Sequence, residues 1–138
     1  MVKDLVVDLE GLFEKYRKVK PYLIPRSPAP EKERIQTPEE RKKFDEAIRC
    51  ILCGSCTAAC PITEENSNYL GPAALLRAFR YLFDSRDGAD DERKKMLDGE
   101  DGAWGCKVHH KCTEVCPKDI PVTKSITHIK MKIMGKMD

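Results

Sequence analysis

The chain has 138 residues, a length that predicts a single domain with one modest core. Its 25 Lys and Arg nearly balance its 23 Asp and Glu, so the charge gives no reason to expect a nucleic acid as partner. The longest apolar run is interrupted by Arg77 and Arg80 and falls short of the roughly 20 residues that a membrane span needs. Seven cysteines, an odd number, with no apolar signal segment after Met1, favour reduced thiols in a cytosolic protein over a secreted disulfide framework.

Near the N-terminus, apolar residues recur at three- and four-residue spacing and predict an amphipathic helix over residues 4–20. They are Leu5, Leu9, Leu12, Phe13, Tyr16 and Val19. Four prolines follow between residues 21 and 30, and because each fixes its own φ, they predict an extended strap. We therefore expect one domain over residues 1–138, with a helix and strap in residues 1–36 and the core in residues 37–138.

Further helical patterns follow in the predicted core. Residues 37–40, Thr-Pro-Glu-Glu, form a capping-box sequence that predicts a helix running to about residue 48. A third helix is predicted from Gly71-Pro72, a short fourth helix between Asp90 and Gly99, and a last helix from residue 121 to residue 135. No segment has the alternation of a strand, so the predicted fold class is all-α.

The seven cysteines belong to two copies of one motif. The first copy reads Cys50-Ile-Leu-Cys53-Gly-Ser-Cys56-Thr-Ala-Ala-Cys60-Pro61, and the second reads Cys106-Lys-Val-His109-His-Lys-Cys112-Thr-Glu-Val-Cys116-Pro117. The spacing C-x2-C-x2-C-x3-C-P is that of bacterial ferredoxins, in which the fourth cysteine ligates the other cluster. Three thiolates at this interval surround one cluster only if the backbone between them is a loop, which the small residues Gly54 and Ser55 favour.

Crossed ligation assigns the cysteines to two iron-sulfur clusters. A [4Fe-4S] cluster is assigned to Cys50, Cys53, Cys56 and Cys116, which leaves Cys60, Cys106 and Cys112 for the second cluster. Because only three thiolates remain there, a [3Fe-4S] cluster is the simplest interpretation. His109 is a possible extra ligand that would make a second [4Fe-4S] cluster, although a histidine at such a position is more often outside the ligand set.

Structural zinc is the competing interpretation, since paired cysteines bind zinc and His109 or His110 would complete its tetrahedral site. A third cysteine at the same short interval and a Cys-Pro ending are superfluous for zinc and typical of iron-sulfur clusters. The spacing therefore favours iron and sulfide over zinc.

Around these motifs, the chain resembles the C-terminal half of the iron-sulfur subunit of succinate dehydrogenase and fumarate reductase. The resemblance extends over essentially the whole chain and rests on residues 2–8, 20–23, 50–53, 71–74, 80–87 and 116–118. It implies an α-helical ferredoxin-like domain with two cluster-binding loops, carrying a [4Fe-4S] and a [3Fe-4S] cluster with the same crossed ligands.

The resemblance also implies a non-catalytic electron-transfer subunit. In this family, electrons pass between a flavoprotein that oxidises succinate or reduces fumarate and a quinone bound against a membrane anchor subunit. The implied location is peripheral, on the cytoplasmic face of the membrane. No C-x4-C-x2-C run precedes Cys50, so we expect the family's plant-type [2Fe-2S] domain to be truncated, lost or carried by another chain.

The segment after Pro61 bears on quinone binding. Many succinate dehydrogenases place tryptophan there, whereas this chain has Ile-Thr-Glu-Glu at residues 62–65, in a shorter loop that looks more like fumarate reductases. Pro61 and Lys107 are the candidate quinone contacts. Two other functions stay open: the iron-sulfur component of a heterodisulfide reductase or glycolate oxidase complex, which a complete second motif would favour, and a free-standing dicluster ferredoxin.

Overall fold

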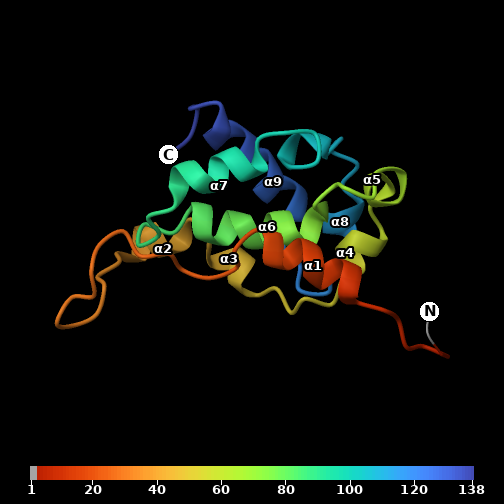
Figure 1. Ribbon diagram of the computed structural model, residues 1–138, viewed down its shortest axis with the longest axis horizontal. Coiled ribbons are helices and arrows are strands. Elements are labelled where there is room, and N and C mark those ends of the chain that lie inside the picture. Colours follow the sequence, from red (N-terminus) through yellow and green to blue (C-terminus); the bar gives the residue numbers. More distant parts are fainter. Residues whose placement is uncertain (1–2) are drawn as a thin grey trace.

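The computed structural model describes residues 3–138, which form helices around one long central helix (Figure 1). Met1 and Val2, the first residues of the predicted domain, lie outside the described residues. The helices are α1 (Glu10–Lys18), α2 (Pro38–Lys42), α3 (Asp45–Ile48), α4 (Ser55–Ala58), α5 (Pro61–Glu65), α6 (Gly71–Leu82), α7 (Asp90–Leu97), the 3-10 turn η1 (Ala103–Gly105), α8 (Lys111–Glu114) and α9 (Val122–Ile133). Within residues 3–138 the only β pairing is two isolated bridges, Lys3 with Val6 and Pro25 with Asp87. The predicted all-α class is confirmed.

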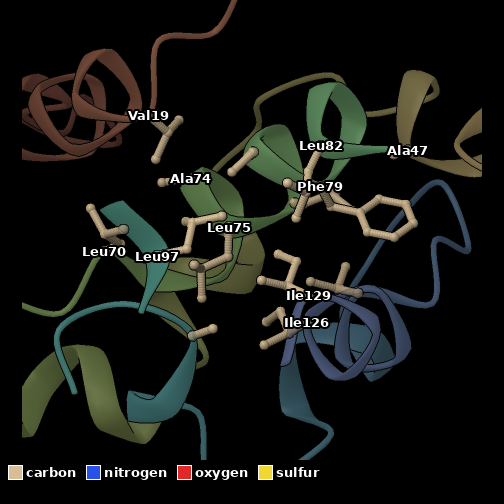
Figure 2. Packing of buried hydrophobic residues seen from close by; sticks show 14 of the residues in the cluster. Val19, Ala47, Leu70, Ala74, Leu75, Phe79, Leu82, Leu97, Ile126 and Ile129 are labelled. Carbon is tan, nitrogen blue, oxygen red and sulfur yellow. The ribbon is translucent and has the colours of Figure 1, made fainter. Parts of the chain in front are cut away.

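Helix α6 is the centre of the core. Only Arg77, Arg80 and Tyr81 among its residues are not buried, as expected for a helix that is apolar on nearly every side. Helices α1, α3, α4, α7 and α9 all pack against it. Figure 2 shows Leu75 of α6 close to Ile126 and Ile129 of α9, and all three are at most 1% exposed. This packing brings α9 alongside the segments that carry the cysteines.

The predicted helix over residues 4–20 is wrong at its start. Helix α1 begins only at Glu10, and residues 3–9 lead away from the other helices (Figure 1). The Asp8 carboxylate accepts a hydrogen bond from the Glu10 backbone N–H (2.9 Å), a local bond that competes with continuing the helix backwards. Leu5 is 94% exposed, so no core packing supports a helix there. The predicted helix is therefore correct over Glu10–Lys18 and too long at both ends.

The predicted helix from residue 37 to residue 48 is interrupted. Its capping box is confirmed, because Thr37 Oγ1 accepts from the Glu40 N–H (3.2 Å) and Glu40 Oε2 accepts from the Thr37 N–H (2.8 Å). Helix α2 nevertheless ends at Lys42, and α3 starts after Phe44, whose φ of −128° is not helical. Phe44 is fully buried, with the Arg80 guanidinium 4.3 Å from its ring centroid. The break between the two helices therefore falls at a residue whose ring is buried in the core.

The predicted helices near residues 71, 90 and 121 are confirmed as α6, α7 and α9. Three short helices and η1 have no counterpart in the prediction. Helices α4, α5 and α8 have four or five residues each, too few for an apolar period to be recognised. In residues 3–138, no helix has both the length and the apolar character needed to cross a bilayer.

Candidate metal centres

The two cysteine loops share one backbone conformation. Leu52 and Val108 have positive φ angles of 55° and 60°, and Gly54 and His110 follow at matching positions with 78° and 61°. Each loop then enters a four-residue helix, α4 in the first motif and α8 in the second. Left-handed residues turn the chain sharply and are unfavourable for side chains such as valine, so this strain makes both loops candidates for a functional site. The sequence repeat is therefore also a structural repeat.

The first cavity brings together cysteines from both motifs. Four of its lining residues are Cys50, Cys53, Cys56 and Cys116. Apolar residues complete the wall, among them Ala73 and Leu76 of α6 and Ile120 just before α9. Cys116 belongs to the second motif but reaches the first cavity because α4 packs against α8. The four thiols assigned to the [4Fe-4S] cluster thus face the same space, and their coordination of iron stays a prediction.

The second cavity contains the remaining three cysteines, Cys60, Cys106 and Cys112. Pro61, Lys107 and His109 line it as well, so the candidate quinone contacts and the possible extra ligand all lie at this cavity. Lys107 and His109 are exposed, which places both at the surface of the site. The ring of Tyr69, only 1% exposed, forms part of the inner wall.

Neither cavity has the geometry of a single-ion site. Among residues 3–138, no three His, Cys, Asp or Glu side chains come close enough together to hold one metal ion. Three or four thiols spread around a cavity are the donor set of an iron-sulfur cluster, in which each sulfur binds a different iron. The thiols present therefore fit iron-sulfur clusters. His109 and His110 line the second cavity together with its three cysteines, but among the described residues no group of these side chains could hold a single ion such as zinc.

Burial governs the protonation of these thiols. It raises the pKa of Cys56 to about 12, and it also raises the pKa of Cys112. At the exposed end of the first loop, a hydrogen bond with the Ser55 hydroxyl lowers the pKa of Cys53. Because a buried thiolate without a positive partner is unfavourable, the inner cysteines need a cation to become anionic ligands. Iron would supply that charge.

A pair of threonines next to Cys112 has no signal in the sequence motif. Thr123, at the start of α9, places its Oγ1 3.3 Å from the Cys112 sulfur and 2.9 Å from the Thr113 Oγ1. Thr113 Oγ1 also accepts a hydrogen bond from the Thr123 backbone N–H at 3.0 Å. Since α9 follows the second motif and folds back over α8, only the tertiary structure could reveal this contact.

The side chains of Lys130 and Trp104 support the loop of the second motif at Cys106. Lys130 of α9 donates a hydrogen bond to the Cys106 carbonyl oxygen (2.8 Å), and its ammonium lies 5.7 Å from the centre of the Trp104 ring. The Trp104 indole N–H in turn donates to Asp98 (2.7 Å). These contacts fix the backbone on which Cys106 stands.

Comparison with known proteins agrees with this geometry. A family model described as "4Fe-4S dicluster domain" matches residues 46–120, which include all seven cysteines. Among solved structures, a chain of the "Mycobacterium smegmatis Sdh1 complex in the apo form" superposes with a TM-score of 0.85 at 28% sequence identity. The superposition covers 96% of this chain and 56% of that one.

Three curated relatives are named as succinate dehydrogenase iron-sulfur subunits. The one from Coxiella burnetii is 39% identical over 139 residues, covering 100% of this chain and 59% of the relative. The Paracoccus denitrificans protein is 42% identical (99% and 53%), and the mitochondrial protein of Candida glabrata is 42% identical (96% and 53%). The chain therefore spans little more than half the length of the curated relatives it matches.

Proposed function

Because this chain belongs to the 4Fe-4S dicluster domain family, we propose that it carries electrons as part of a succinate dehydrogenase or fumarate reductase complex. The three relatives named above support the complex, and the thiol-lined cavities support the electron-carrying role. No catalytic group for succinate or fumarate is assigned to this chain. Its partners would be a flavoprotein subunit and a membrane anchor subunit, with the chain peripheral on the inner face of the membrane.

The ligand sets are the specific part of the proposal. Cys50, Cys53, Cys56 and Cys116 would hold a [4Fe-4S] cluster, and Cys60, Cys106 and Cys112 a [3Fe-4S] cluster. The observation that carries this assignment is the interleaving of the two motifs, since Cys116 lines the first cavity and Cys60 lines the second. When bound, such clusters supply one-electron carriers. The apolar walls from α6 and α9 would keep water from them, and the shared helices would hold the two sites next to each other.

Quinone binding is proposed for the side of the second cluster. Pro61 and Lys107 both line that cavity, and the exposed Lys107 ammonium could donate a hydrogen bond to a quinone oxygen. A quinone there would exchange electrons with the second cluster over a short distance. Binding of a quinone analogue by the assembled complex should weaken in Lys107→Ala, and unchanged binding would remove Lys107 from the site.

The proposal is tested by purifying the chain without oxygen and measuring iron, acid-labile sulfide and electron paramagnetic resonance. We expect about seven irons per chain and signals from one [3Fe-4S] and one [4Fe-4S] cluster. Zinc without sulfide would contradict it. Copurification with a flavoprotein would support the complex, whereas a stable, monodisperse chain without partners would favour a free-standing ferredoxin.

A further inference from the structure

The Cys112 sulfur has a hydroxyl neighbour for which metal ligation gives no role. Thr123 is 3% exposed and Cys112 is 7% exposed, so water has little access to their 3.3 Å contact. A buried hydroxyl needs a hydrogen-bond partner, and here its neighbours are the sulfur and the Thr113 hydroxyl. The direction of these hydrogen bonds decides whether the Cys112 sulfur accepts one.

The order of the protons follows from the chemistry of the groups. An iron-bound thiolate carries no proton and can only accept, so the Thr123 hydroxyl must donate to it. The Thr123 oxygen then accepts the Thr113 hydroxyl proton, and the Thr113 oxygen accepts the Thr123 backbone N–H (3.0 Å). Every donor in this closed chain points toward the sulfur, and such aligned hydrogen bonds strengthen one another in a buried site.

We propose that Thr123 donates a hydrogen bond to the Cys112 thiolate and thereby raises the reduction potential of the second cluster, an inference that rests on the proposed function. Reduction makes the ligand sulfurs more negative, so a hydrogen-bond donor stabilises the reduced state more than the oxidised state. Thr123 touches a ligand and tunes it without being one.

The first site also has a threonine with a buried hydroxyl beside a cysteine, Thr57 next to Cys56, but among the described residues the Thr57 Oγ1 has no partner of normal hydrogen-bond geometry and is not linked to a second hydroxyl. The hydroxyl beside Cys53 belongs to Ser55, at 3.4 Å and on the exposed side of the loop. The Cys116 sulfur accepts the Ile120 backbone N–H at 3.5 Å. The buried, aligned donor is therefore a feature of the second site, and it would favour reduction of the second cluster.

Thr123→Val tests the proposal in the full chain carrying both clusters, because valine keeps the shape and removes the hydroxyl. The readout is a redox titration of the second cluster followed by its paramagnetic resonance signal, with iron and sulfide measured in parallel. We expect the reduced-to-oxidised ratio at the unaltered chain's midpoint potential to fall about tenfold, which for a one-electron couple is a shift of about 59 mV to lower potential. An unchanged midpoint with an intact second cluster would overturn the proposal.

Matched variants separate this effect from loss of structure. Thr123→Ser keeps the hydroxyl and should keep the potential. Thr127→Val on the same helix should also keep it, because among residues 3–138 the Thr127 hydroxyl donates only to the Thr123 carbonyl oxygen (3.0 Å). If Thr123→Val does not assemble, Thr113→Val should lower the potential in the same direction by a smaller amount, and no shift there would overturn the proposal. An unaltered chain without a second cluster would contradict the proposed function itself, whereas unchanged potentials with both clusters present would contradict only the role of Thr123.

Discussion

Arg93 and Asp87 form an ion pair from which solvent is almost wholly excluded. Their side chains are 1% and 2% exposed, and Arg93 Nη2 donates to Asp87 Oδ2 at 2.8 Å while Nε donates to Oδ1 at 3.1 Å. The other three N–H groups of the Arg93 guanidinium donate to the backbone carbonyls of Val19, Lys20 and Tyr22. All five N–H groups of the guanidinium are thus used. One side chain of α7 holds the start of the N-terminal strap against the core.

Replacing Arg93 by leucine should therefore destabilise the protein strongly. The change removes the positive partner of a buried carboxylate, which keeps only the backbone N–H groups of Ile24 and Ala89, and it removes the guanidinium donors from three carbonyls. About 3–5 kcal/mol is the expected cost. Arg17→Ala is the matched control, since Arg17 pairs with Glu10 on the surface, where a salt bridge contributes about 0–1 kcal/mol. Thermal unfolding of both variants measures the difference. Equal midpoints for the two variants would show that Arg93 does not hold the strap.

Gly105 precedes Cys106 and should not tolerate a side chain. A Cβ at this position would lie 2.3 Å from the Glu100 carbonyl oxygen and 2.7 Å from the Tyr69 ring, so the loop would have to move. We expect Gly105→Ala to cost about 1–3 kcal/mol and to reduce occupancy of the second cluster more than that of the first. Gly99→Ala is the control in the same loop, because nothing lies within 4 Å of its Cβ position. The measurements are iron content and the paramagnetic resonance signal of each cluster. Equal cluster occupancy in the two variants would contradict the packing argument.

His128 should make stability fall as the solution becomes acidic. Burial lowers its pKa and Lys124 lowers it further, against an opposing effect of Glu46, while its ring lies 6.3 Å from that of Phe79. Because the folded-state pKa is below the unfolded value of about 6.5, the stability contributed by neutral His128 is complete above that pH and is lost as the pH falls through the folded-state pKa.

The measurement for His128 is the thermal midpoint at pH values from about 7.5 down to about 5.5. The unaltered chain should lose more stability over this range than His128→Gln, in which the group that titrates is removed. The other two histidines are present in both chains and cancel in the comparison. Parallel curves for the two proteins would rule out this role of His128.

His109 stands where the first motif has Cys53, and exchanging it for cysteine should complete the second motif. With four thiolates available, the second site should retain a fourth iron, raising the content from about seven to about eight irons per chain and removing the [3Fe-4S] signal. His109→Ala should leave the count and the signal unchanged if His109 is no ligand. Loss of one iron in His109→Ala would instead show that the histidine binds it.

The features that short-range patterns determine could be predicted from the sequence. Cysteine spacing alone groups Cys116 with the thiols of the first motif, and the two cavities contain the groups so predicted. Helices with a clear apolar period are predicted well: the start of α6 at Gly71 is correct, and the bounds of α9 are correct to within two residues. The start of α1 is not, because Leu5 continues the period although it has no core to face.

Contacts between residues far apart in the sequence could not be predicted from local sequence patterns. Thr123 lies in the helix that follows the one containing Cys112, and nothing in its local sequence distinguishes it from Thr127. The same holds for Arg93, which in sequence belongs to an ordinary charged helix and in the structure is one of the most buried side chains. The three carbonyls that it binds, those of Val19, Lys20 and Tyr22, are more than 70 residues away at the end of α1 and the start of the strap.

Exchanging single cysteines for serine in the two crossing positions tests the central claim most directly. Cys116→Ser should impair the [4Fe-4S] signal of the reduced chain and preserve the [3Fe-4S] signal, although Cys116 belongs to the second motif. Cys60→Ser should do the reverse. If Cys116→Ser instead removes only the second cluster and Cys60→Ser only the first, each motif binds its own cluster and crossed ligation is wrong.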